Sequence, residues 1–127
     1  MKQLRGEALV ARGIASFNAG RLREALADFR AATRLGVDRE DARYFSAHAH
    51  LSLGEIPAAL AAFADLIRAH PGYLPAYLDL AGLLHQQGRL LDAAKTLRAA
   101  LKREPDHAQA RRRLAEIKTG GGAAAKS

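Results

Sequence analysis

Three short stretches of this chain repeat one pattern: NAGRLREAL at residues 18–26, LSLGEIPAAL at 51–60 and QQGRLLDAA at 86–94. Each contains a glycine, a variable residue, an aliphatic residue, two further residues and then alanine. The three glycines stand 34 residues apart. A fixed period of this length is typical of proteins built from stacked structural repeats.

Other small or apolar residues recur with the same period. The recurring sets are Gly20, Gly54 and Gly88; Ala25, Ala59 and Ala93; Phe29, Phe63 and Leu97; Gly13, Ala47 and Ala81; and Val37, Pro71 and Pro105. This pattern resembles the tetratricopeptide repeat (TPR) family over about residues 6–107. The resemblance implies antiparallel helix pairs that stack side by side.

The periodicity within each repeat is also helical. Apolar residues recur at spacings of three and four, as in Leu22, Leu26 and Phe29, and glycine is suited to end one helix before the next begins. The expected helices lie near 6–19, 22–35, 40–53, 56–69, 74–87 and 90–103, with a seventh from about 108 to 118. We therefore expect an all-α fold, a solenoid of antiparallel helix pairs with about seven helices.

The period also divides the chain into segments. The expected segments are an N-terminal lead at 1–5, three repeats at 6–39, 40–73 and 74–107, a capping helix at 108–118 and a flexible tail at 119–127. A terminal repeat needs a cap whose outer face is polar, and the sequence AQARRRLAEIK offers one.

Four positions depart from the family pattern. Arg12 and Ser46 stand where an aliphatic residue is usual, and Ser16 and His50 stand where an aromatic residue is usual. We expect Arg12 to lay its aliphatic stem along the apolar surface while its charged end reaches water.

Composition narrows the class of protein. The chain has 127 residues, 49% of them hydrophobic, and no cysteine, which excludes disulfides and thiolate metal sites. No apolar stretch is long enough for a signal peptide or a membrane span. We therefore expect a soluble, cytoplasmic protein.

Catalytic and metal-binding patterns are missing from the sequence. There is no HExxH, no phosphate-binding glycine loop and no nucleophile elbow. His48 and His50 are two residues apart on an expected helix, so they point to different faces and do not form a metal pair. We expect a non-enzymatic protein without metal or cofactor.

The resemblance to TPR proteins also predicts a binding surface. In that family the first helix of each pair lines a concave groove, which usually grips a peptide or helix of another protein. The residues assigned to this groove are Val10, Ile14, Phe17, Asn18, Asp41, Tyr44, His48, Leu51, Leu78, Gly82, His85 and Gln86, with Arg112 added from the capping helix.

The predicted groove is more apolar and aromatic than charged. Some family members clamp a terminal carboxylate with Lys, Asn and Arg, but here the corresponding places hold Val10, Ile14, Tyr44, His48 and Asp79. We therefore expect an apolar peptide or an amphipathic helix as the partner, rather than an acidic tail. The alternative is that the large apolar groove residues pack inside the stack.

Three other hypotheses stay open. The stretch DARYFSAHAHLSLGEIPAALAAF, at residues 41–63, is similar to the middle repeat of bacterial type III secretion chaperones, which hold hydrophobic substrates. Residues 95–127 carry nine basic and three acidic residues, so an acidic partner or, less well supported, a nucleic acid could bind there. An unfilled apolar face also favours a homo-oligomer.

Overall fold

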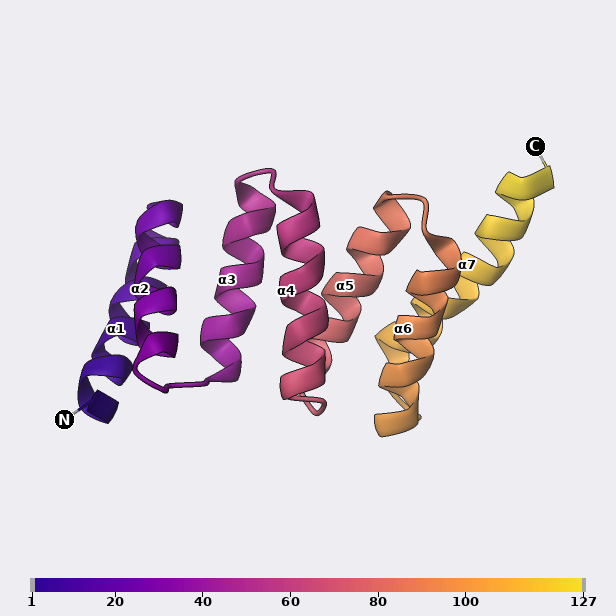
Figure 1. The fold of residues 1–127 in the computed structure, drawn as a ribbon. Helices are drawn as coiled ribbons and strands as arrows, with labels where there is room; N and C mark the ends of the chain where they lie inside the picture. Colours follow the sequence, from indigo (N-terminus) through magenta and orange to yellow (C-terminus); the bar gives the residue numbers. More distant parts are fainter. Residues whose placement is uncertain (1, 127) are drawn as a thin grey trace. The chain divides into compact units, whose positions relative to one another are not determined.

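Seven α-helices make up the part of the chain that the structure describes. The computed structural model describes residues 2–126, with the side chains of Gln3 and of residues 119–126 left aside. The helices are α1 (Lys2–Asn18), α2 (Leu22–Arg34), α3 (Glu40–Ser52), α4 (Ile56–Ala69), α5 (Leu74–Gln86), α6 (Leu90–Arg103) and α7 (Ala108–Lys126) (Figure 1). No strand occurs in residues 2–126, so the expected all-α class is confirmed.

The predicted helix limits agree with the structure except at the two ends of the chain. Helices α2 to α6 begin where expected and end within one residue of the expected positions. Helix α1 begins at Lys2, so the expected N-terminal lead is helical. Helix α7 continues past residue 118 to Lys126, through most of the segment expected to be a tail.

The repeated glycines end helices in the way the sequence predicts. Gly20, Gly54 and Gly88 have φ angles of +82°, +77° and +77°, which are left-handed conformations that side chains disfavour. The amide of the next residue donates to the carbonyl five residues back, as in Arg21 N to Ser16 O at 2.8 Å. This hydrogen bond caps the helix and starts the turn into its antiparallel partner.

The chain forms two compact units, Met1–Ala69 and His70–Ser127. The first unit holds the helix pairs α1–α2 and α3–α4, with α3 also contacting α1 and α2. The second holds the pair α5–α6 and the helix α7, which packs on α6. Leu97, Ala110 and Ile117 are buried there.

The core of the first unit joins α1 and α2 to the start of α3. Its buried members are Val10, Ala25, Phe29, Ala32, Val37 and Ala42. Small residues let the paired helices approach closely, since a Cβ built on Gly13 would lie 2.6 Å from Cε1 of Phe29. The recurring alanines at 25, 47, 59 and 93 are fully buried for the same reason.

Arg12 forms an ion pair with Asp28 of the facing helix α2. Its Nε and Nη2 atoms donate to the Asp28 carboxylate at 2.9 and 2.8 Å, and the Asp28 side chain is only 12% exposed. The sequence-based expectation for Arg12 was therefore incomplete, because the guanidinium neutralises a carboxylate of the facing helix. This hydrogen bond to Asp28, reinforced by the opposite charge, raises the pKa of Arg12.

Replacing Gly13 with alanine tests the close approach of α1 and α2. On an open helix this change stabilises by about 1 kcal/mol, but here the added methyl group meets the buried Phe29 ring. We expect Gly13→Ala to lower the free energy of unfolding by about 1–2 kcal/mol in urea denaturation, since overpacking outweighs helix propensity.

Gly72→Ala is the matched control, because a Cβ at Gly72 meets nothing within 4 Å. Its free energy of unfolding should stay within about 0.5 kcal/mol of wild type. A Gly13→Ala variant about 1 kcal/mol more stable than wild type would show that the contact with Phe29 does not constrain the helix pair.

Candidate partner-binding surface

A row of aromatic rings crosses the first unit from α1 through α3 to α4. The centroids of Phe17 and Phe45 lie 5.1 Å apart, and those of Tyr44 and His48 lie 4.6 Å apart. Tyr44 also contacts Phe45 at 6.1 Å, and His48 contacts Phe63 at 5.2 Å. All four pairs are tilted or edge-to-face, the arrangement that aromatic quadrupoles favour. The row therefore fixes the orientation of half-buried rings.

The predicted groove residues of the first unit have different environments. Val10 is fully buried in the core, so its assignment to an accessible groove was wrong. It faces α2 because α1 turns that side toward Phe29. Ile14 and Phe17 are half-buried and pack against the same core, and Asn18 is exposed at the end of α1.

The predicted residues on α3 keep part of their surface open. Tyr44, His48 and Leu51 are all half-buried, and their spacing of three and four residues places them on one side of the helix. Tyr44 and His48 pack on neighbouring rings and also retain exposed surface, so both readings left open by the sequence stay open.

Asp41 is engaged within the fold. Its carboxylate accepts a hydrogen bond from Arg39 Nη2 at 2.6 Å and another from the backbone amide of Ala42 at 2.8 Å. Arg39 in turn donates to Glu7 of α1 at 2.7 Å. The hydrogen bond to Asp41, followed by that to Glu7, raises the pKa of Arg39. Asp41 thus ties the start of α3 to α1.

Phe45 is the residue that sequence reasoning missed in this unit. It is half-buried, packs against the core and bridges Phe17 and Tyr44. Its position next to Tyr44 in the sequence could have revealed it, but the helical spacing assigned only Tyr44 to the groove. An aromatic ring is long enough to reach both the core and the edge of the exposed side.

The second unit places four predicted residues on α5. Leu78 and Gly82 are half-buried, while His85 and Gln86 are exposed. The last three of these border a hollow of about 230 Å³ that α6 and α7 also line.

Arg113, rather than the predicted Arg112, borders this hollow. Its Nη1 donates to the Leu78 carbonyl at 2.8 Å, and a Cβ on Gly82 would stand 3.4 Å from that nitrogen. Arg112 is exposed and is not part of the lining. The rotation of α7 explains the shift by one residue, and Gly82 leaves room for the guanidinium.

A polar link holds the end of α3, which carries His48 and Leu51. Glu55 Oε1 lies within hydrogen-bond distance of His50 Nδ1, at 2.8 Å. Glu55 Oε2 accepts a hydrogen bond from Arg23 Nη2 of α2 at 3.2 Å. The hydrogen bond with His50, followed by the contact with Arg23, lowers the pKa of Glu55, although burial acts in the opposite direction.

The described residues give no support to a metal site or a membrane span. No group of three or more His, Cys, Asp or Glu side chains in this part of the chain is placed to hold a metal ion. None of its helices is both long and apolar enough to cross a bilayer.

Family models for the tetratricopeptide repeat match residues 10–73 and 51–117. The chain belongs to the tetratricopeptide repeat family. TPR domains typically act as non-enzymatic scaffolds for protein interactions, and the TPR fold here serves as a protein-interaction module. No curated protein matches the sequence.

Solved TPR structures share the fold at low sequence identity. The TPR domain of Arabidopsis OM64 is 19% identical, with a TM-score of 0.78 and coverage of 94% of this chain and 99% of that one. The first TPR domain of Spaghetti (RPAP3), solved with the HSP90 peptide SRMEEVD, is 18% identical, with a TM-score of 0.78 and coverage of 94% and 95%. The Yersinia enterocolitica type III secretion chaperone SycD, in complex with a peptide of the translocator YopD, is 16% identical, with a TM-score of 0.78 and coverage of 91% and 93%.

The link at the end of α3 predicts a pH dependence. A carboxylate whose pKa is lowered by folding stabilises the fold above its unfolded pKa, near 4.5, and loses that contribution as the pH falls further. We expect Glu55→Gln to be less stable than wild type at pH 7. The difference should shrink between pH 5 and pH 3, as measured by urea unfolding.

Glu104→Gln provides the control, because Glu104 lies on the exposed surface and forms no ion pair in the described structure. Its stability should follow wild type more closely across the same range. A constant difference between Glu55→Gln and wild type from pH 7 to pH 3 would contradict the proposed link.

Proposed function

We propose that this TPR protein binds a largely apolar peptide or amphipathic helix of another protein on the α1–α3 side of its first unit. The observation that carries the proposal is the row of half-buried aromatic side chains Phe17, Tyr44 and His48, continued by Leu51. Aromatic side chains with a fixed orientation and remaining exposed surface are typical anchors of protein interfaces.

The chemistry of this surface supports an apolar ligand. Its half-exposed members Ile14, Phe17, Tyr44 and Leu51 carry no charge, and the nearby Asp41 is already bound to Arg39. A carboxylate clamp would need cations at these positions. An acidic tail is therefore a weaker candidate than a segment with two or three large apolar side chains.

The expected affinity is moderate. Burying a few large side chains gains about 25 cal/mol per Å² of apolar surface, and part of that gain is lost in ordering the peptide. A dissociation constant on the order of 1 μM is consistent with this balance. Helix-in-groove binding and extended-peptide binding both agree with such a surface.

The neighbouring structures with bound peptides support the general mode. The RPAP3 domain holds an HSP90 peptide, and SycD holds a translocator peptide. The likeness to SycD keeps a narrower hypothesis open, in which this chain is a chaperone for a hydrophobic secretion substrate. A bacterial origin belongs to that hypothesis and stays a prediction. The cytoplasmic location expected from composition also stays a prediction, as does self-association.

A second candidate surface is the basic region of α6 and α7. No basic side chain between residues 95 and 118 forms an ion pair in the described structure, and Arg111 and Arg112 are exposed. Such uncompensated charge favours an acidic partner, whose binding would weaken steeply as salt is added. Nucleic acid is less well supported, since no aromatic side chains alternate with these cations.

Selection from a random peptide library tests the main proposal. We expect wild-type protein to enrich peptides with two or more large apolar residues, and to bind them with dissociation constants on the order of 1 μM by fluorescence anisotropy. Leu51→Asp should weaken binding at least tenfold, because it places a charge against an apolar ligand.

Leu91→Asp is the matched control, since Leu91 is 87% exposed on α6 and belongs to the second unit. Both variants should keep the helical signal and cooperative melting of wild type. Enriched peptides that bind Leu51→Asp as tightly as wild type would contradict the proposed surface. Acidic peptides released by 0.5 M salt and by Arg111→Gln with Arg112→Gln would favour the basic surface instead.

A further inference from the structure

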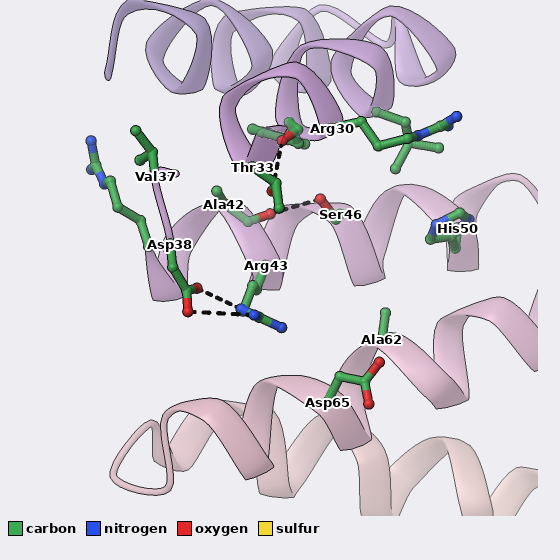
Figure 2. A pocket seen from close by; sticks show the side chains of 13 residues that line it. Arg30, Thr33, Val37, Asp38, Ala42, Arg43, Ser46, His50, Ala62 and Asp65 are labelled. Atoms are coloured by element: carbon green, nitrogen blue, oxygen red, sulfur yellow. Dashed lines mark hydrogen bonds and ion pairs between the residues drawn. The ribbon is translucent and has the colours of Figure 1, made fainter. Parts of the chain in front are cut away.

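The first unit also contains a hollow, which lies among α2, α3 and α4 and is not part of the proposed binding surface. Its volume is about 220 Å³ (Figure 2). Leu26, Phe29 and Ala62 supply apolar wall, while Arg30, Arg43 and His50 supply polar groups. Figure 2 shows that α2, α3 and α4 each contribute side chains around it. We call this hollow the arginine pocket.

The arginine pocket is separate from the aromatic row. Its α3 residues are Ala42, Ser46 and His50, which follow one another at four-residue steps, and Arg43 beside them. At 100° per residue, this set lies on the side of α3 opposite Tyr44 and His48. A ligand in the pocket would therefore leave the aromatic row free.

The size of the arginine pocket indicates what it can hold. Pockets for cofactors and drug-sized ligands usually measure about 300–1,000 Å³. A volume of about 220 Å³ is smaller than this range but large enough for one bulky side chain. The pocket is therefore suited to a single anchor residue of a partner protein.

Most polar groups of the pocket already have partners within the fold. The Thr33 hydroxyl donates to the Phe29 carbonyl at 3.0 Å, and the Ser46 hydroxyl donates to the Ala42 carbonyl at 2.8 Å. Arg43 Nε donates to Asp38 at 2.6 Å (Figure 2).

Arg30 differs from these neighbours. The other charged lining residues, Asp38, Arg39, Arg43 and Asp65, are all in ion pairs, whereas Arg30 has no ion-pair or hydrogen-bond partner in the described structure. It is also exposed. A carboxylate brought in by a partner would meet a guanidinium that has no competing internal contact.

We propose that the arginine pocket is a docking site for an acidic protein segment, which inserts one large apolar side chain while a neighbouring carboxylate pairs with Arg30. Charge complementarity supports this occupant. The lining of the pocket carries three arginines, Arg30, Arg39 and Arg43, against two aspartates, Asp38 and Asp65, and this net positive charge disfavours a second copy of the same pocket and attracts an acidic partner. The apolar wall gives the inserted side chain its burial, and Arg30 selects the acidic neighbour.

Three blocked pentapeptides test both parts of this site by two-dimensional NMR of the full chain. They are Glu-Glu-Phe-Glu-Glu, Glu-Glu-Ala-Glu-Glu and Gln-Gln-Phe-Gln-Gln. We expect the first to shift the amide signals of Arg30, Thr33 and Ser46 with a millimolar dissociation constant. The second, without the ring, and the third, without the charge, should each bind at least fivefold more weakly.

Arg30→Gln should reduce binding of the first peptide to the level of the uncharged one. Arg34→Gln is the matched control, because Arg34 is an exposed arginine of the same helix that does not line the pocket. It should bind as wild type does, as should Leu51→Asp, which separates this site from the aromatic row. Both arginine variants should melt within a few degrees of wild type.

Several results would overturn the proposal. One is the absence of shifts around the pocket at 5 mM peptide, and another is equal weakening by Arg30→Gln and Arg34→Gln. Shifts confined to Arg111 and Arg112 would assign the acidic peptide to the basic surface of α7. Equal affinity for the charged and uncharged phenylalanine peptides would remove Arg30 from the site, and a dimer broken by Arg30→Gln would make the occupant a second copy.

Discussion

The close approach of α1 and α2 is the constraint on which the rest of the first unit depends. Phe29 lies against the bare backbone of Gly13, where even one methyl carbon would overlap the ring. This contact sets the separation and rotation of the pair, and it brings Val10 into the core beside Phe29. The same small-residue rule operates where Ala47 and Ala59 are fully buried in the next pair.

The packing of the helix pairs gives α3 its two different sides. One side holds Tyr44 and His48 against Phe63 of α4, so that the rings are ordered but still partly exposed. The other side holds Ala42 and Ser46, whose short side chains leave the arginine pocket open between α2 and α4. Both candidate surfaces thus follow from how α3 is placed, and neither requires a flexible loop.

The sequence predicted those features that depend on local chemistry. Helix ends at Gly20, Gly54 and Gly88 were predictable because a left-handed residue and its capping hydrogen bond involve only a few neighbouring residues. Val10 was assigned to the wrong environment and Phe45 was missed because the rotation of a helix is set by the helix that packs on it. The pair Arg12–Asp28 was missed for the same reason, since it joins side chains of facing helices 16 positions apart.

The departures from the family pattern point to where this chain differs from a generic TPR protein. Ser16 and Arg12 depart in the first repeat, and there Arg12 meets the nearly buried carboxylate of Asp28. Ser46 and His50 depart in the second repeat, and both line the arginine pocket. A larger aliphatic side chain at Ser46 and an aromatic ring at His50 would occupy space that the pocket now leaves open. The arginine pocket is the more distinctive of the two candidate sites, because two residues that depart from the family pattern line it.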